Sequence, residues 1–418
     1  MLYEFIKFKE SILENTKSKS SLRSLPRNIW AVTIASFFTD VSSEMIFNLV
    51  PLYLANVLGV GTAIIGLIDG IAETTASLMK VYTGSLSDKL GQRKWLAVAG
   101  YALSTFSKPF LFIAATWEWV LGVRFSDRLG KGIRTAPRDA LVADSIDEKQ
   151  RGLAFGVHRA GDTAGAFLGL GIAALIVWFT EANGLKLEQH TFQIAVLISF
   201  VPAVLGVVAL IWGAHEVPMK TKRKSALPSL EGLDTRFKLF LFVVLVFTLG
   251  NSSDSFIILL GQNRGLDIVQ IMLMLMTFNF VYASLSGPLG SWSDKIGRRR
   301  LIIGGWIAYG LVYLGLAFSN AGWHVWVLYT LYGIYYAATD GVGRALVADF
   351  VPEERRGAAY GLYNAAIGIT VLPASVIAGV LWQGLGAWHG FGASAPFYFG
   401  AALALLAGIL FWRLVPSK

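Results

Sequence analysis

Long apolar stretches separated by short polar loops make up almost the whole chain. Each stretch has about the 20 residues that an α-helix needs to cross the hydrocarbon core of a bilayer. A transmembrane β-barrel would instead show alternating strands of about ten residues, and the sequence contains none. The pattern therefore predicts an all-α polytopic membrane protein with twelve transmembrane helices. The predicted spans are residues 29–56, 60–84, 94–115, 117–144, 150–180, 190–213, 237–260, 267–290, 300–319, 323–349, 355–383 and 393–414.

Three sequence blocks of the first half return in the second half in the same order. They are GSLSDKLGQRK at 84–94 and GSWSDKIGRRR at 290–300, ALVADSIDEKQRG at 140–152 and ALVADFVPEERRG at 345–357, and SSE at 42–44 and SSD at 252–254. The repeat predicts two pseudo-symmetric six-helix bundles of the same orientation, an arrangement that places a substrate site at the midplane between them. We expect a tail at 1–28, bundles at 29–214 and 237–418, and a polar, basic linker at 215–236.

The composition agrees with a membrane location. Only 15% of the residues are charged and the mean hydropathy is +0.57, whereas soluble domains carry about 25% charged residues. The formal charge of +9 comes largely from short loops on one side of the predicted membrane, so we expect no nucleic-acid partner. The positive-inside rule makes that side the cytoplasm, and it predicts a cytoplasmic (inner) membrane protein with both termini in the cytoplasm. The chain has no cysteine, which excludes disulfides and thiolate metal sites.

The sequence GSLSDKLGQRK resembles the loop between the second and third helices of major facilitator superfamily (MFS) transporters. The matching residues are Gly84, Asp88, Gly91, Arg93 and Lys94 in the first half, and Gly290, Asp294, Gly297, Arg298 and Arg299 in the second. The resemblance covers residues 29–414 and implies a carrier whose loops form a cytoplasmic latch, closed when the carrier faces outward. The alternative is a pair of loops that only set the topology. We also expect structural gating pairs beside the latch, at Arg138, Asp139, Asp144, Arg344 and Asp349.

The fourth predicted span is rich in basic residues, which are Arg124, Arg128, Lys131, Arg134 and Arg138. A charge at the bilayer centre costs about 2.5–3.5 kcal/mol, so exposing all five to lipid would cost roughly 12–18 kcal/mol. We therefore expect these side chains to face protein or water. Arg128 and Gly132 match the Arg-x-x-x-Gly pattern in the fourth helix of proton-coupled MFS exporters, and TDVSSEMIFNLVPLYL resembles a prokaryotic subgroup of mainly uncharacterised carriers.

The resemblance implies that the first and fourth helices of each half line a central cavity, so an acidic first helix can face the basic fourth helix. The proton-coupling candidates are Asp40, Glu44, His158 and Asp162. The substrate-cavity candidates are Arg124, Asp127, Arg128, Lys131, Arg134, Arg159, Asp254, Tyr336, Asp340 and Asn364. Burial favours a protonated carboxyl group and a nearby arginine favours the ionised one, so movement between states can load and release a proton. The alternative is a carboxylate that is permanently paired with an arginine.

These features predict a secondary active transporter that moves a small solute across the membrane by alternating access, coupled to protons. The sequence has no P-loop, nucleophile elbow or zinc motif, so we expect no enzyme activity, no cofactor and no metal site. The basic stripe favours an anionic or zwitterionic cargo, and the alternative is a proton-coupled multidrug exporter of lipophilic cations. A metal carrier, a lysolipid carrier and a non-transporting membrane sensor are less favoured. By analogy with the family we expect a monomer.

Overall fold

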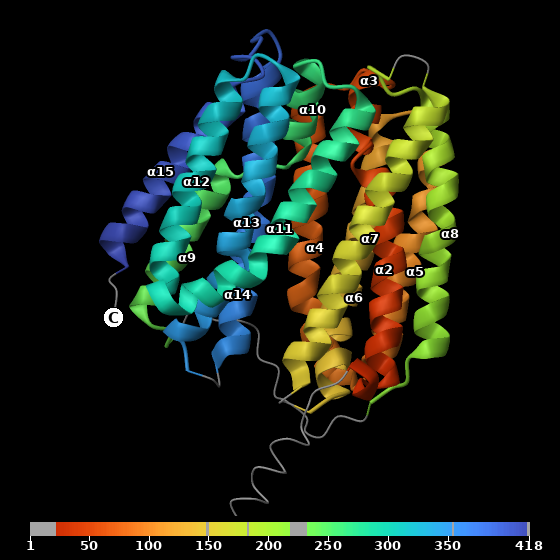
Figure 1. The fold of residues 1–418 in the computed structure, drawn as a ribbon, viewed down its shortest axis with the longest axis vertical. Coiled ribbons are helices and arrows are strands. Elements are labelled where there is room, and N and C mark those ends of the chain that lie inside the picture. Colours follow the sequence, from red (N-terminus) through yellow and green to blue (C-terminus); the bar gives the residue numbers. More distant parts are fainter. Residues whose placement is uncertain (1–21, 148–149, 182–183, 218–231, 353–354, 416–418) are drawn as a thin grey trace, which may run out of the picture.

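The computed structural model describes residues 22–147, 150–181, 184–217, 232–352 and 355–415. Within these ranges the chain is helical and contains no β-strand (Figure 1). The elements are η1 (Leu22–Ser24), α2 (Arg27–Phe47), α3 (Val50–Asn56), α4 (Thr62–Leu90), α5 (Lys94–Ser107), η2 (Lys108–Ile113), α6 (Trp117–Asp144), α7 (Arg151–Thr180), α8 (Gln189–Gly213), α9 (Thr235–Gly250), α10 (Ser255–Asn263), α11 (Ile268–Ile296), α12 (Arg298–Phe318), α13 (Gly322–Phe350), α14 (Arg356–Gln383) and α15 (Ala395–Leu414). Most of the predicted tail and linker lies outside the described residues.

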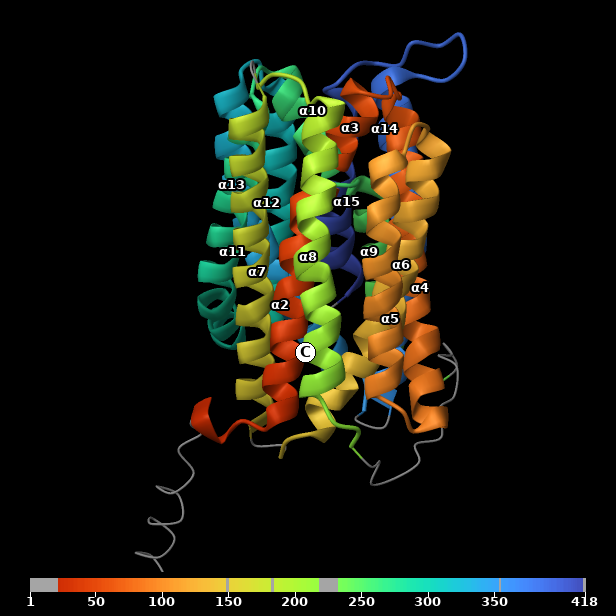
Figure 2. The same cartoon turned by 90° about the vertical axis from the view of Figure 1, so that its right-hand side faces the viewer.

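The helices form twelve spans in two six-helix bundles, which confirms the predicted fold class. Helices α2 to α8 make one half and α9 to α15 the other, and the short helices α3 and α10 lie side by side at one end of the molecule (Figures 1 and 2). Nine segments among the described residues are long and apolar enough to cross a membrane. The spans that contain α2, α6 and α13 are not among these nine, and all three helices contribute side chains to a central cavity.

Three spans that the sequence predicts as continuous helices are broken. The first span divides into α2 and α3 at residues 48–49. Pro51 lies in the first turn of α3 and has no N–H to donate to the carbonyl group of Phe47. In the third span Pro109 follows α5, and the chain tightens into the 3₁₀-helix η2. The seventh span divides into α9 and α10 at residues 251–254, so the first helix of each half is interrupted.

Helices α4 and α11 continue beyond their predicted ends. They reach Leu90 and Ile296, so Asp88 and Asp294 lie in the last helical turn and not in a loop. Gly91 then ends α4 with φ of 67°, a left-handed conformation that glycine adopts without steric cost. We call this end of the molecule, which carries the two repeated basic loops, the basic-loop end. The opposite end is the α3–α10 end.

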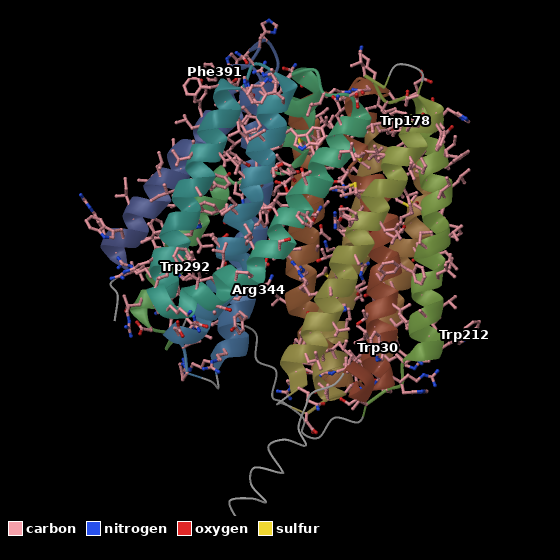
Figure 3. All side chains as sticks on the ribbon, in the orientation of Figure 1. Trp30, Trp178, Trp212, Trp292, Arg344 and Phe391 are labelled. Atoms are coloured by element: carbon pink, nitrogen blue, oxygen red, sulfur yellow. The ribbon has the colours of Figure 1, made fainter. Side chains whose placement is uncertain are left out.

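Tryptophan side chains are exposed near both ends of the bundle. Trp178 lies near the α3–α10 end, and Trp30 and Trp212 lie near the basic-loop end (Figure 3). Indole rings gather at the two interfaces between membrane and water, where one side of the ring is apolar and the N–H is wet. Exposed leucine, isoleucine and phenylalanine side chains cover many of the helices as well. The tryptophans therefore mark the two borders of a lipid-facing belt.

Helices α4 and α14 form a close seam between the two halves. Gly379 packs on α4 so tightly that a Cβ atom would lie 2.3 Å from the carbonyl oxygen of Thr62. A Cβ atom on Gly368 would lie 2.2 Å from the Cβ atom of Ser77. The hydroxyl groups of Thr62 and Thr74 donate across the seam to the carbonyl groups of these two glycines. The small residues let the helix backbones touch, and the halves are sealed from the α3–α10 end to the middle of α4.

Candidate functional site

A central cavity of about 390 Å³ lies between the two halves. It is lined from α2, α4 and α6 in the first half, and from α13, α14 and the break before α10 in the second. Its basic side chains are Arg124, Arg128, Lys131 and Arg134, and its acidic side chains are Asp40, Glu44, Glu73, Asp127 and Asp254. The aromatic rings of Phe47 and Tyr336 complete the wall. The basic stripe of α6 therefore faces a nearly equal number of carboxylates.

Two arginines of α6 are paired with carboxylates of α4. Arg124 donates from Nη2 to Oδ1 of Asp69 at 2.7 Å, and each of the two residues is only 5% exposed. Nε of Arg128 lies 3.2 Å from Oε1 of Glu73 and 4.0 Å from Oδ2 of Asp127. A buried charge needs such a partner because its desolvation otherwise costs several kcal/mol. The pairing explains how α6 carries this stripe inside a membrane protein.

Three cations surround the ring of Phe47, the last residue of α2. Nζ of Lys108 and the guanidinium carbons of Arg124 and Arg128 lie 5.6, 4.6 and 5.2 Å from the ring centroid. Lys108 has no exposed surface and donates to two serine hydroxyls of α2 at 2.7 and 3.0 Å. Each cation–π contact is worth about 0.5–2 kcal/mol. The ring thus ties the break in the first span to the basic fourth helix.

The other two basic side chains of the cavity have no carboxylate partner among the described residues. Arg134 donates from Nη1 to the hydroxyl of Ser104 at 2.7 Å and lies 4.6 Å from the ring centroid of Tyr101. Lys131 has no carboxylate within 4.0 Å in the part of the chain that the structure describes. The charges of these two side chains are therefore available to a molecule in the cavity.

Asp69 joins the two halves at the break in the seventh span. Its Oδ1 atom binds Arg124 in its own half, and its Oδ2 atom accepts a hydrogen bond of 2.8 Å from Ser253 in the other half. Ser255 donates to the same oxygen atom. One buried carboxylate therefore links the fourth helix of the first half to the first, interrupted helix of the second half. This link closes the cavity towards the α3–α10 end.

Glu44 and Asp254 come from the repeated blocks SSE and SSD, and both line the cavity. Glu44 accepts a hydrogen bond of 2.7 Å from the side-chain amide of Asn48. Asp254 precedes α10 at the break. Neither carboxylate has a basic side chain within 4.0 Å among the described residues. The duplication thus supplies the cavity with one carboxylate from each half.

The four proton-coupling candidates fall into two places. Asp40 and Glu44 line the central cavity, whereas His158 and Asp162 of α7 do not. His158 is buried, and its Nε2 atom lies 3.7 Å from Oδ2 of Asp162. The charges of Asp40, Asp162 and Arg138 lie close enough to influence one another. The α7 pair therefore lies behind the cavity wall, next to one of the cavity carboxylates.

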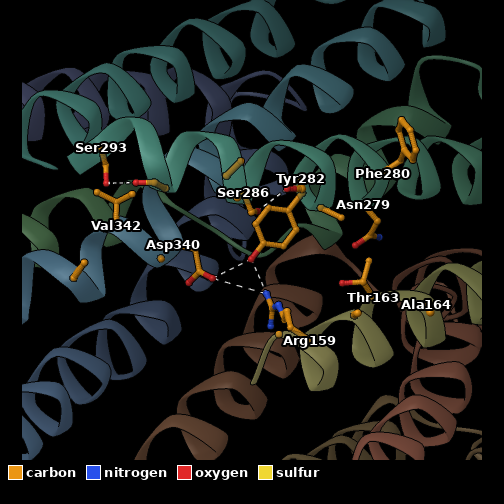
Figure 4. A pocket seen from close by; sticks show the side chains of 18 of the residues that line it. Arg159, Thr163, Ala164, Asn279, Phe280, Tyr282, Ser286, Ser293, Asp340 and Val342 are labelled. Atoms are coloured by element: carbon orange, nitrogen blue, oxygen red, sulfur yellow. Dashed lines mark hydrogen bonds and ion pairs between the residues drawn. The ribbon is translucent and has the colours of Figure 1, made fainter. Parts of the chain in front are cut away.

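A second cavity of about 1070 Å³ lies between α7, α11 and α13 (Figure 4). Arg159 of the first half donates to the hydroxyl of Tyr282 at 2.6 Å and lies 3.9 Å from Oδ2 of Asp340. Tyr282 donates to the same aspartate at 3.0 Å. Asp294 and Arg298 also line this cavity, which reaches the basic-loop end. Arg159 and Asp340 thus lie here and not in the central cavity.

The predicted latch and gate residues pair within their own halves. The ion pairs are Arg93–Asp88 (2.6 Å), Arg93–Asp144 (3.3 Å), Arg138–Asp139 (2.8 Å), Arg298–Asp294 (3.1 Å), Arg298–Asp349 (2.7 Å) and Arg344–Asp340 (3.3 Å). Gly84 packs near Ala136 of α6, whereas a Cβ atom on Gly290 would meet no atom within 4 Å. Over the described ranges, the contact between Arg159 and Asp340 is the one ion pair that joins the halves. The described latch and gate residues therefore make no ion pair between the halves in this conformation.

The sequence matches the family model of the Major Facilitator Superfamily over residues 32–253 and 239–418. The chain belongs to the major facilitator superfamily. It is 35% identical over 403 residues to an uncharacterised MFS-type transporter of Methanocaldococcus jannaschii, and the match covers 94% of this chain and 96% of that protein. It is 23% identical over 375 residues to a multi-drug resistance efflux pump PmrA homolog of Lactococcus lactis, covering 85% and 89% of the two chains. The nucleoside transporter NupG has a similar structure, with a TM-score of 0.72, 16% identity and coverage of 94% and 100%.

Membership of the superfamily confirms that the protein is a multi-pass membrane transporter for small molecules and not an enzyme.

The site residues predicted from the sequence did not include Asp69, Glu73 or Phe47. Asp69 and Glu73 were detectable, because they are two carboxylates four residues apart in the second span. No signal in the sequence reveals Phe47, because its cations come from two other spans. Asn364 of α14, in turn, lines neither of the two cavities.

Proposed function

We propose that this superfamily member moves a small anionic or zwitterionic solute across the cytoplasmic membrane by alternating access, coupled to protons. The central cavity carries the proposal, because Lys131 and Arg134 present charges there and have no carboxylate partner in the part of the chain that the structure describes. A polar cavity between two six-helix halves is the usual place for a carrier's substrate. We further propose that the transporter acts as a single chain, without a cofactor, and has both termini in the cytoplasm.

The proposed cycle follows from the contacts between the halves. The seam of α4 and α14 closes the α3–α10 end, while the latch residues pair inside each half. The conformation is therefore the one that faces the basic-loop end, which the positive-inside rule makes the cytoplasm. In the opposite state, we propose, Asp88 and Asp294 leave Arg93 and Arg298 and bind cations across the interface. Such exchange between two discrete arrangements is what a rocking carrier requires.

The proton sites of the proposal are Asp40 and Glu44, with His158 and Asp162 behind them. Asp40 has Lys131 and Arg134 among its charged neighbours. A change in the distance between α2 and α6 would therefore change the field at Asp40, and a cargo anion that binds the two cations would do the same. Both changes alter the proton affinity of the carboxylate, which couples cargo binding to proton binding.

Export of lipophilic cations is the second candidate function. It is supported by five acidic side chains in the cavity and by the similarity to proteins named as multi-drug resistance efflux pumps. Lys131 and Arg134 weigh against it, because they have no carboxylate partner among the described residues and a cargo without an anionic group would leave both charges unpaired. The anionic or zwitterionic cargo therefore remains the first proposal.

Reconstituted liposomes with an internal pH indicator test the proposal. We expect organic anions or zwitterions from a broad panel to move protons through the wild type. Arg134→Ala should slow this movement at least about tenfold, because a hydrogen bond to a charged group is worth about 1.5–3 kcal/mol. Arg134→Lys keeps the charge and is the matched control. Transport of a lipophilic cation alone, at a rate that Arg134→Ala leaves unchanged, would support the exporter instead.

A further inference from the structure

The central cavity presents two opposite charges that neighbouring side chains do not neutralise. Lys131 has no carboxylate within 4.0 Å, and Asp254 has no basic side chain within that distance, among the described residues. Buried polar atoms in the same wall also lack hydrogen-bond partners in the described part of the chain. They are Nε and Nη1 of Arg124, which is 5% exposed, and Oδ1 of Asp127, which is 2% exposed. Unpaired buried polar groups are costly, so this wall is built to meet a charged or polar molecule.

The two opposite charges lie at different depths. Asp254 stands between Ser253 and Ser255, whose hydroxyl groups bind Asp69 at the closed end of the cavity. Lys131 lies about two turns further along α6 than Arg124, which binds Asp69, and so about 10 Å closer to the basic-loop end at 1.5 Å per residue. Both residues line the cavity, Asp254 towards its closed end and Lys131 towards the basic-loop end. A cargo that carries two opposite charges at separate positions can therefore contact both.

The wall next to Asp254 is aromatic. Tyr336 of α13 lines the cavity, and Asp254 is among the charged neighbours of its ring. Tyr332 and Phe278 hold this ring from the side, with centroid distances of 5.2 and 5.4 Å and near-perpendicular planes. A cation over a tyrosine ring gains about 0.5–2 kcal/mol, and a carboxylate beside it adds direct pairing. The charged and aromatic groups together suit an ammonium group.

We propose that the cargo is a zwitterion, with its ammonium group bound between Asp254 and Tyr336 and its anionic group bound to Lys131. This inference rests on the proposed function, since it places the cargo in the same cavity, and it narrows the cargo to molecules that carry both charges. Glu44, the repeat-related partner of Asp254, lines the same cavity and is among the charged neighbours of Asp254, after Glu73 and Asp69. A plain anion would leave Asp254 without a partner, and a plain cation would leave Lys131 without one.

Matched ligands separate the contributions of the two charges. The probes are 4-aminobutyrate and 6-aminohexanoate, each compared with the carboxylate and the amine of the same chain length, in thermal unfolding and in liposome transport. We expect each amino acid to bind at least about tenfold more tightly than either analogue, since one charge-assisted contact is worth about 1.5–3 kcal/mol. Lys131→Met should abolish this advantage and leave amine binding intact. Asp254→Asn should abolish it and leave carboxylate binding intact.

Control variants remove a similar charge elsewhere in the membrane region. Lys80→Met and Glu118→Gln alter side chains that do not line the central cavity, and both should keep the preference for the amino acid. Tyr336→Phe should retain ammonium binding and Tyr336→Leu should weaken it. These results would support the inference, because a variant that merely misfolds would lose binding of the carboxylate and of the amine alike.

Two other outcomes are distinguishable. If the carboxylates bind and are transported as well as the amino acids, and Asp254→Asn has no effect, the zwitterion is wrong and the proposed anion transport stands. If neither carboxylates nor amino acids bind, and lipophilic cations are transported at a rate that Lys131→Met leaves unchanged, the proposed function itself is wrong and the inference fails with it.

Discussion

The interface between the halves is built differently at its two ends. At the α3–α10 end the halves bind each other directly. Asn56 and Gln262 exchange amide hydrogen bonds of 3.0 and 2.7 Å, and Asp69 accepts hydrogen bonds from two serines of the other half. At the basic-loop end the charged residues bind within their own half, as Arg93 does with Asp88. One end is joined by amide hydrogen bonds, by the Asp69 carboxylate and by close glycine contacts. At the other end the ion pairs of the repeated loops stay within each half.

The difference shows how the two ends can switch. A seam sealed by glycines depends on shape, so a single added side chain disrupts it. A more exposed ion pair such as Arg298–Asp294 is worth only about 0–1 kcal/mol, so it exchanges partners at little cost. We therefore expect the α3–α10 end to respond strongly to changes in packing, and the basic-loop end to respond weakly to the loss of single charges.

Asp69→Asn should give the largest effect. It leaves Arg124 buried without a counter-ion, and breaking a buried ion pair costs about 3–5 kcal/mol. The thermal unfolding midpoint in detergent should fall clearly. Asp88→Asn, which alters a more exposed pair, is the control and should change the midpoint little. An unchanged midpoint for Asp69→Asn would mean that the α3–α10 end does not depend on this carboxylate.

Gly368→Leu should open the α4–α14 seam. Its side chain would overlap Ser77, and overpacking of this kind costs about 1–3 kcal/mol, which shifts an equilibrium between states roughly 5- to 150-fold. The chain has no cysteine, so a single cysteine at Ser43→Cys in the cavity can be labelled without background. We expect faster labelling by an impermeant maleimide from the α3–α10 side. Gly290→Leu, in open space, should not increase that rate.

Tyr282→Phe tests the polar contact that crosses the interface at the second cavity. It removes the hydroxyl group between Arg159 and Asp340, and one such hydrogen bond is worth about 0.5–1.5 kcal/mol. Labelling of the same cavity cysteine from the basic-loop side should change by a few fold. Tyr360→Phe, on α14, is the control. A change as large as that of Gly368→Leu would contradict the distinction between the two ends.

Loss of the latch charge should have the smallest effect on stability. Asp294→Asn removes a partner of Arg298, which keeps Asp349 at 2.7 Å. The unfolding midpoint should therefore stay within the small range expected of exposed ion pairs. If the loops form a latch in the opposite state, Asp294→Asn should slow transport even though it leaves the unfolding midpoint nearly unchanged. Glu118→Gln, at the α3–α10 end, should leave the transport rate unchanged. Equal transport rates for the two variants would support loops that only set the topology.

The sequence predicts the fold well for two reasons. The membrane imposes a minimum length on each transmembrane helix, and the duplication imposes the same order of helices on both halves. Apolar length fixes the number of spans, and the repeated blocks fix the two halves. Charge alone also indicates that α6 cannot face lipid, so its partners must lie inside the protein. The repeat even relates Glu44 to Asp254, which both line the cavity. These features are local or periodic, and a single chain displays them.

The remainder depends on contacts between distant segments. Pro51 lies inside an apolar run of ordinary length, so the break after Phe47 was not predicted. Arg159 is close in sequence to the predicted proton sites, yet it points to a different cavity because α7 packs beside α11. The basic residues of α6 look alike in the sequence. Only the structure shows that Arg124 is paired with a carboxylate and that Lys131 and Arg134 are not paired with one among the described residues. Partner choice requires knowing which helices are neighbours.

The near balance of charge in the central cavity has a consequence for the membrane voltage. Its four basic and five acidic groups sum to a single negative charge when all are ionised. Each elementary charge that crosses the field is worth about 2.3 kcal/mol per 100 mV. One bound proton makes the site neutral, and a neutral zwitterion leaves that balance unchanged. In a proton-coupled cycle only one of the two crossing steps carries the proton, so that step moves no net charge of the site through the field. The other step moves one negative charge, and a change in resting potential should alter the rate of that step alone.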